Sequence, residues 1–330
     1  MQPQPRRVMR RILPGFWGAC LAAFVVAGAS AQSYPSRNIT IIVPFPAGGI
    51  VDAAARLLQP ELEKALGRNV VIENRGGAAG AVGTAAVAKA EPDGHMLLMV
   101  TSSHTTTPVI NSKLPYDTER DLAAVSLFAR DPLIFVVSNK VAAKTLPEFV
   151  AAAKAEPGKF NYATPGFGSG GHFVTELLSE RAGIKIQHVP YRGGAPAGIA
   201  LVTGEAHFGA LSGQVSLPHI ESGAMRAIAV GGLTRHPKLP DVPTVAESGY
   251  PDFEAVQWVG LLAPGGTPKE IIDRLNRVIA ETVKTPEVVA RISSQGMSPV
   301  ASTPEEFQKI IETEVKQWKD VAKAANIKPE

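Results

Sequence analysis

The sequence predicts an α/β fold with largely parallel sheets. Short runs rich in Val, Ile, Leu and Phe alternate with segments of helical periodicity. Glycine-rich turns follow several of these runs directly, as they do where a strand leads into a helix. The runs that we interpret as strands cover residues 39–45, 70–73, 96–100, 133–137, 161–164, 186–189, 208–211, 225–230 and 258–263.

Capping boxes mark the predicted helix starts, because a hydroxyl residue and a Glu three positions later satisfy free backbone N–H groups. They are Thr145 with Glu148, Thr267-Pro268 with Glu270, and Thr303-Pro304 with Glu306. The last box opens a helix with a single apolar face, which we expect to pack on a sheet. That face consists of Phe307, Ile310, Ile311, Val315, Trp318, Val321 and Ala322.

The N-terminus has the pattern of a secretory signal peptide. Four arginines, Arg6, Arg7, Arg10 and Arg11, precede an apolar run at residues 16–26 and the small residues 29–31. We predict export by the general secretory route, with cleavage after residue 31. A retained membrane anchor is the alternative, but the apolar run is short for a bilayer span.

The composition of the remaining chain excludes several classes of protein. Without the leader's four arginines, the mature chain has 29 basic and 30 acidic residues, and its net charge is close to zero. We therefore predict no nucleic-acid partner. The one cysteine, Cys20, lies in the leader, which excludes disulfides and zinc–thiolate sites in the mature chain. We expect no metal and no cofactor.

The stretch from Ile39 to Asp52 predicts an anion site. An apolar strand runs through Phe45 into the turn Ala47-Gly48-Gly49 and then into a helix. A glycine turn at a helix start directs free backbone N–H groups and the positive end of the helix dipole to one point. We therefore interpret this turn as half of a carboxylate-binding cleft.

The design of this unit occurs twice in the chain. A strand, a glycine turn (47–49), a helix and a second strand lead to residues 73–77, and a second unit with the turn 168–171 leads to residues 190–194. Each later glycine pair opens a helix of small residues. Two lobes of one design are implied, with glycine turns at strand ends, where open α/β sheets place ligands.

Two enzyme motifs are present only in part. Gly166, Gly168 and Gly171 satisfy GxGxxG, but the next strand ends in Tyr191 rather than in the acid that a dinucleotide site needs. Ser169 has the position of a nucleophile at a strand-to-helix turn, but the required glycine two residues earlier is Phe167 in this chain. Anion recognition by the same turn does not depend on either motif.

Several polar residues have two interpretations at this stage. Asp52 can stabilise the start of its helix or contact a ligand, and His104 and His172 can be ordinary helix-start residues or ligand contacts. Residues 101–107, which read TSSHTTT after an apolar strand, predict a donor loop. Its place at a strand end favours a binding role.

A series of longer motifs runs in order along nearly the whole mature chain. They are YPSRNITIIVPFPAGG, VVIENRGGAAGAVG, AKAEPDG, LPYD, PGKFNYATPG, HVPYRGGAPA, LPDVPTVAESG and LLAPGGTP. By these motifs the chain resembles the Bug family of periplasmic solute receptors, the extracytoplasmic subunits of tripartite tricarboxylate transporters. The resemblance implies a two-lobed periplasmic binding protein of the Venus flytrap type, with mostly parallel sheets flanked by helices. It places one lobe at 32–131 plus 256–330 and the other at 132–255.

The resemblance also implies that main-chain N–H groups and ordered water hold a carboxylate between the lobes. The implied ligand-binding residues are Phe45, Ala47, Gly48, Gly49, Asp52, Thr101, Ser102, Ser103, His104, Gly168, Ser169, Gly170, Gly171, His172, Gly194, Ala195, Ser212, Gly213 and Gln214. Three departures from the family pattern leave the ligand open: Ile50-Val51, Gly76 and Gly213-Gln214. Beside Phe45, Ile50 is a candidate to face an apolar body on the ligand.

The expected function is therefore that of a monomeric receptor without catalytic residues. It captures a small organic carboxylate and delivers it to the membrane subunits of a transporter. Two alternatives stay open: a sensor that presents its ligand to a signalling receptor, and an exported α/β hydrolase or dehydrogenase.

Overall fold

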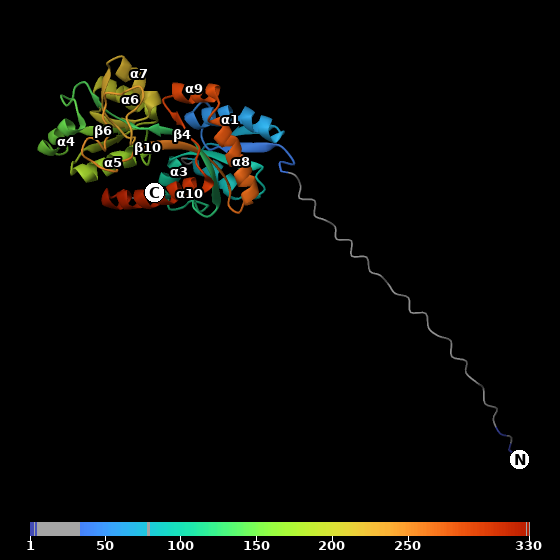
Figure 1. Cartoon of the computed structure of the whole chain (residues 1–330). Helices are drawn as coiled ribbons and strands as arrows, with labels where there is room; N and C mark the ends of the chain where they lie inside the picture. The colour runs from blue at the N-terminus through green and yellow to red at the C-terminus, as the bar shows by residue number, and fades with distance from the viewer. Residues whose placement is uncertain (3, 5–33, 78–79, 328, 330) are drawn as a thin grey trace. The chain divides into compact units, whose positions relative to one another are not determined.

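The computed structural model describes residues 1, 2, 4, 34–77, 80–327 and 329 (Figure 1). The chain divides into two units, Met1–Ser33 and Tyr34–Glu330, and the second contains the folded elements below. The predicted signal-peptide cleavage site lies outside the described residues. Among the described residues, no helix combines the length and hydropathy that a membrane span requires.

The second unit contains two sheets with separate cores. In spatial order, the first sheet consists of β11 (Ser298–Pro299), β4 (Leu122–Pro132), β10 (Val256–Pro264), β3 (Met96–Thr101), β1 (Ile39–Val43) and β2 (Val70–Asn74). The second sheet consists of β7 (Gln187–Pro190), β6 (Asn161–Thr164), β8 (Phe208–Leu211), β5 (Ile134–Ser138) and β9 (Met225–Val230).

Helices cover both faces of each sheet. In the first sheet, one face packs against α1 (Ile50–Leu66), α8 (Lys269–Thr282) and α9 (Pro286–Ser294), and the other against α2 (Ala81–Ala88) and α10 (Pro304–Ala324). In the second sheet, α4 (Leu146–Ala155) and α5 (Gly170–Ala182) cover one face, and α6 (Gly194–Thr203) and α7 (Gly213–Glu221) cover the other. The remaining helix, α3 (Ser103–Ile110), directly follows β3.

Both sheets are mixed, whereas the sequence predicts mostly parallel ones. The strands that precede or follow the glycine turns do pair in parallel, namely β1 with β2 and β3, and β6 with β7 and β8. Antiparallel pairing is confined to β10, β11 and β5 with their neighbours. The strands β4 and β10 connect the sheets, since β5 begins two residues after β4 and β10 follows the return from β9 (Figure 1).

Strand β4 is the main element that the sequence pattern does not reveal. It contains Ser126, Arg130 and Asp131 among its apolar residues, which interrupt the run that would signal a buried strand. Ser126 is nevertheless buried, because its hydroxyl donates to the carbonyl oxygens of Leu127 and Ser302. Hydrogen bonds within the folded protein thus allow a polar residue to be buried in a strand, which the sequence pattern by itself does not predict.

The C-terminal helix packs on the first sheet, as its apolar face predicts, and also on the second core. Phe307 and Ile311 belong to the core of the first sheet. Trp318 and Val321 belong to the core of the second, where the Trp318 ring lies 5.6 Å from that of Phe173. α10 therefore bridges the two cores.

A helix begins at each of the three predicted starts, but of the three predicted capping boxes the reciprocal one forms only at α10. Thr303 and Glu306 form the reciprocal capping box, and the Thr145 hydroxyl accepts from the Glu148 N–H. At α8 the capping residue is Pro268 and no side chain caps the helix. The Thr267 hydroxyl instead donates to the carbonyl oxygen of Pro264, so the predicted box with Glu270 is wrong.

Candidate functional site

The first glycine turn is held in shape by a buried carboxylate. Oδ2 of Asp52 accepts from the Gly48 N–H at 3.0 Å and from the Arg56 Nε at 2.9 Å, and Oδ1 accepts from the Asn74 amide at 3.1 Å. The hydrogen bond from Arg56 is the main reason why the pKa of Asp52 is lowered. Gly48 has φ +84°, a conformation that favours glycine. These hydrogen bonds favour the structural role of Asp52 over contact with a ligand.

In the second glycine turn, a glycine N–H again donates to a side chain four residues later, but here the acceptor is neutral. The Gly168 N–H donates to Nδ1 of His172 at 3.2 Å, and the His172 ring stacks on that of His188 at 4.0 Å. Burial lowers the pKa of His172 to about 3 and that of His188 to about 4, so both rings are neutral at neutral pH. The Ser169 hydroxyl donates to the carbonyl oxygen of Gly166 at 2.7 Å.

The predicted donor loop is in fact the start of a helix. Ser102 is the capping residue of α3, and the hydroxyls of Thr105, Thr106 and Thr107 donate to carbonyl oxygens of the preceding turn. The threonine hydroxyls therefore satisfy the helix backbone and are buried. The local reason is that threonine hydroxyls can bond to carbonyl oxygens three or four residues earlier, which makes a TSSHTTT run compatible with a helix.

A cavity of about 300 Å³ lies between the two sheets, at the carboxyl ends of their parallel strands. Its lining comes from the ends of β3 and β8, from the segments after β1, β3, β6, β7 and β8, and from β10. The lining residues are Phe45, Ile50, Thr101, Ser102, Ser103, Pro165, Ser169, Gly170, Gly194, Ala210, Leu211, Ser212, Gln214, Val215 and Gln257. None of these described residues carries a charge.

Five helices begin at this cavity. They are α1, α3, α5, α6 and α7. Each lines the cavity with its capping residue or with its first or second helical residue. Among them, α1, α3, α6 and α7 have no side-chain hydrogen bond at the cap. Helix starts expose backbone N–H groups and the positive end of the dipole, so the arrangement is suited to an anion.

The structure brings about half of the predicted site residues to this cavity. Those that line it are Phe45, Thr101, Ser102, Ser103, Ser169, Gly170, Gly194, Ser212 and Gln214. Ile50, singled out as a departure from the family pattern, lines it together with Phe45. The predicted residues outside the lining are Ala47, Gly48, Gly49, Asp52, His104, Gly168, Gly171, His172, Ala195 and Gly213.

His104 does not line the cavity. It is buried beside Phe45 and Tyr116 at a separate small void of about 10 Å³. Burial lowers the pKa of His104 to about 4, so the ring is neutral at neutral pH. Its interpretation as a packed core residue fits the structure.

Sequence reasoning missed five lining residues, Pro165, Ala210, Leu211, Val215 and Gln257. Four are apolar and carry no signal of function. Gln257 is different, because an amide within the apolar strand β10 is a sign of a polar partner or a ligand. Its Nε2 lies 3.2 Å from the point where a side chain on Gly170 would begin.

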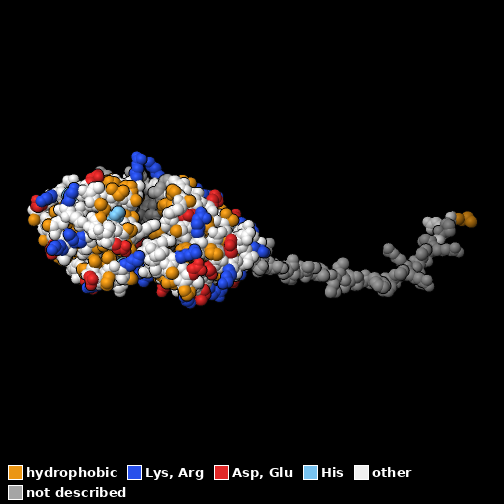
Figure 2. Space-filling view, turned by 90° about the horizontal axis from the view of Figure 1, so that it is seen from above, with side chains coloured by type: hydrophobic (Ala, Val, Ile, Leu, Met, Phe, Trp, Pro, Cys, Tyr) orange, Lys and Arg blue, Asp and Glu red, His pale blue; other side chains and the backbone are white. Residues whose placement is uncertain are grey.

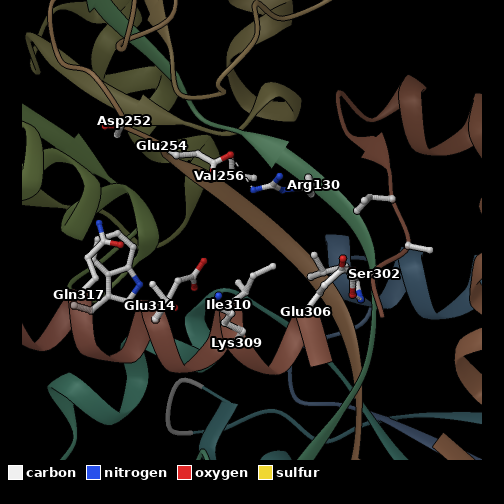
Figure 3. A pocket seen from close by; sticks show the side chains of 15 residues that line it. Arg130, Asp252, Glu254, Val256, Ser302, Glu306, Lys309, Ile310, Glu314 and Gln317 are labelled. Carbon is white, nitrogen blue, oxygen red and sulfur yellow. Dashed lines mark hydrogen bonds and ion pairs between the residues drawn. The ribbon is translucent and has the colours of Figure 1, made fainter. Parts of the chain in front are cut away.

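A second cavity, of about 590 Å³, has acidic walls (Figure 3). Glu314 from α10 lies on one side, and Arg130 pairs with Glu254 at 2.9 Å on the other. Glu314 accepts from the Trp258 indole N–H, its Oε2 lies 2.8 Å from the Thr105 hydroxyl oxygen, and burial raises the pKa of Glu314 to about 7. Its walls also hold Asp252, Glu306 and Lys309, so acidic side chains outnumber basic ones four to two, and this cavity is less suited to an anion than the charge-free one.

The fold is that of a two-lobed periplasmic binding protein, and comparison with solved structures confirms it. A structure from R. palustris described as Rpa4515 with adipate is 33% identical, covers 90% of this chain and 100% of that one, and gives a TM-score of 0.77. MatC from Rhodopseudomonas palustris with bound malate is 32% identical, covers 87% and 99%, and gives 0.73.

Residues 54–327 match the family described as tripartite tricarboxylate transporter family receptor. Protein BugT of Bordetella pertussis is 38% identical over 97% of this chain and 99% of its own length. The chain therefore belongs to this receptor family. The resemblance seen in its motifs is confirmed.

Proposed function

We propose that this protein is a periplasmic receptor that captures a small organic carboxylate in the charge-free cavity and delivers it to the membrane subunits of a tripartite transporter. Family membership supports the receptor role. The relatives solved with adipate and with malate support a carboxylate as the ligand class. The leader predicted at residues 1–31 accounts for export.

The observation that carries the proposal is the convergence of five helix starts on a cavity without charged side chains. Each helix start contributes roughly 0.3–1 kcal/mol to a nearby anion, and hydrogen bonds to a charged acceptor are stronger than neutral ones. Several such donors replace the water shell of one carboxylate. A cation finds no carboxylate side chain among the described lining residues.

The remaining walls fit an apolar carbon body. Phe45 and Ile50 come from the first sheet's side, and Ala210, Leu211 and Val215 come from the second. Ser103, Gln214 and Gln257 add polar groups at separate points of the wall, where a second polar end of the ligand would find donors. A short aliphatic or aromatic acid is therefore a better match than a highly hydroxylated one.

We place the lobes at 32–131 plus 256–330 and at 132–255, in accord with the two sheets. A ligand held by helix starts of both lobes favours their closed arrangement over the open one by the difference in its binding free energy. Strands β4 and β10 are then the hinge. The protein acts as a monomer in this scheme.

We infer that the protein performs no chemistry on its ligand. Ser169 already donates its hydroxyl proton to the Gly166 carbonyl, and Nδ1 of His172 is engaged by the Gly168 N–H. Neither group has the geometry of a nucleophile with its general base. If Ser169→Ala abolished a measurable esterase or amidase activity, this inference would fail.

The proposal is tested by mass spectrometry of any small molecule released from the purified protein, followed by calorimetric titration with adipate, malate, benzoate and a neutral amide of each. We expect at least one acid to bind and its amide to bind at least tenfold more weakly. The proposal is wrong if no acid binds, or if the amide binds equally well. Loss of uptake of that acid in a deletion strain separates transport from sensing.

A pair of variants locates the site. Gly170→Leu adds a side chain at the cavity wall, where it would displace Gln257, and we expect affinity to fall at least tenfold. The control Ala151→Leu adds the same side chain to the exposed side of α4 and should leave affinity unchanged. Equal affinity of the two variants would place the ligand elsewhere.

A further inference from the structure

A buried carboxyl group lies directly behind the charge-free cavity. Asp131, the residue before the end of β4, is only 2% exposed. In the antiparallel pairing of β4 with β10 it lies opposite Gln257, which lines the cavity. Directly opposed residues of such a pair project to the same face of the sheet, so Asp131 is on the cavity side.

Asp131 contacts one of the helix starts that surround the cavity. Its Oδ1 accepts from the N–H of Gly213 at 3.2 Å, and Gly213 is the first residue of α7. The residues on either side, Ser212 and Gln214, line the cavity. Among the residues that the structure describes, Oδ2 of Asp131 has no hydrogen-bond partner.

The surroundings of Asp131 do not neutralise its charge. On β4, the adjacent Arg130 is engaged by Glu254, which precedes β10. On the α7 side, the buried His236 has its Nε2 3.5 Å from the carbonyl oxygen of Gly296, which packs against Gly213, and burial lowers the pKa of His236. Burial raises the pKa of Asp131 to about 7, opposed only by the Gly213 N–H.

We propose that Asp131 couples capture of the carboxylate to uptake of one proton. This inference rests on the proposed function of the cavity. An ionised Asp131 and a bound carboxylate would share the positive end of α7, and two such anions close together disfavour each other. In the bound state Asp131 is neutral, with its proton on Oδ2. The balance is protein–COO⁻ plus H⁺ plus ligand–COO⁻, giving protein–COOH with the ligand still ionised.

The sign of the pH effect follows from this balance. Bound ligand raises the pKa of Asp131, so the complex holds more protons than the free protein over the range between the two values. Affinity then rises as the pH falls, by at most about tenfold per pH unit. His104, His172 and His188 stay neutral between pH 6.5 and 8.5, because their pKa values are about 4 or below.

The experiment is calorimetric titration of the purified protein with adipate and malate from pH 6.5 to 8.5. Each titration near pH 7 is repeated in buffers of different ionisation enthalpy, which counts protons taken up. We expect affinity to weaken at least fivefold from pH 6.5 to 8.5, and a net uptake near pH 7 of about 0.3 to 0.5 proton, because a carboxyl with a pKa of about 7 is already half protonated there. An affinity that is constant over this range, or zero uptake, overturns the coupling and leaves the proposed function intact. Absence of any binding overturns both.

Two matched variants assign the proton to its residue. Asp131→Asn keeps an acceptor for the Gly213 N–H and cannot ionise, so we expect a flat pH profile and no proton uptake. Glu314→Gln is the control, since Glu314 is also buried with a pKa raised to about 7 but belongs to the acidic cavity. If Asp131→Asn kept the slope, or Glu314→Gln removed it, the assignment to Asp131 would be wrong. Proton uptake by the unaltered protein tests the coupling even if a variant does not fold.

Discussion

The two glycine turns share one hydrogen-bond pattern but differ in the charge of the acceptor, which is anionic in the first turn and neutral in the second. In each, a glycine N–H donates to the side chain four residues later, in the first turn of the following helix: Gly48 to Asp52, and Gly168 to His172. Asp52 is ionised and is stabilised by Arg56. His172 is neutral and is stabilised by stacking on His188. The common requirement is an acceptor for one N–H, and the neighbouring side chains determine which acceptor is stable.

The shared hydrogen bond holds both side chains at their own glycine turns, and neither residue lines the charge-free cavity. The start of α1 has no side-chain hydrogen bond at its cap, whereas at α5 the Ser169 hydroxyl accepts from the His172 N–H. On the face shown in Figure 2, basic and acidic side chains are interspersed. Anion recognition is thus expected from backbone groups that the side chains of Asp52 and His172 hold in place.

The largest expected effect is that of removing the charged acceptor. Asp52→Ala leaves the Gly48 N–H and the Asn74 amide without their partner, and we expect the free energy of unfolding to fall by about 2–3 kcal/mol. Asp52→Asn keeps one acceptor oxygen and should cost roughly half as much. Urea denaturation measures both. A loss below about 0.5 kcal/mol for Asp52→Ala would show that Asp52 does not hold the turn.

The next effect concerns the neutral acceptor and its pH dependence. An unfolded histidine has a pKa near 6.5, whereas that of His172 in the folded protein is about 3. Between these pH values the unfolded chain binds more protons than the folded protein. The contribution of His172 to stability is therefore complete above pH 6.5 and decreases as the pH is lowered, by up to about 1.4 kcal/mol per pH unit. We expect His172→Phe, which keeps an aromatic ring, to show a shallower decline in urea denaturation from pH 6.5 to 4.5. An unchanged slope would mean that His172 is not the group responsible.

The smallest effect tests the similarity of the two units. Both helices, α1 and α5, end at a left-handed glycine, Gly67 at φ +68° and Gly183 at φ +63°, and neither has a neighbour that a methyl group would meet within 4 Å. We expect Gly67→Ala and Gly183→Ala each to lower the unfolding free energy by about 1 kcal/mol. Gly49→Ala, at an ordinary φ of −82°, is the control and should change it little. Clearly unequal losses at Gly67 and Gly183 would argue against equivalent ends.

Local patterns predicted a large part of this structure. The strands with parallel neighbours, the cap at Thr303 and the two turn-and-helix units follow from signals within about ten residues. Strand β4 was missed because its polar residues are satisfied by distant partners, such as Ser302 for Ser126. Gln257 could not be assigned to the cavity because it comes from a strand whose neighbours are far away in the sequence.

The sequence by itself determined the receptor family, the two-unit design and the glycine turns that start helices. Only the tertiary structure decided which helix starts meet at one cavity, that His104 and His172 are buried outside its lining, and that Asp131 lies behind it. The physical reason is that turns and caps depend on neighbouring residues. Burial, and with it the charge state of a side chain, depends on what the chain packs against it from elsewhere.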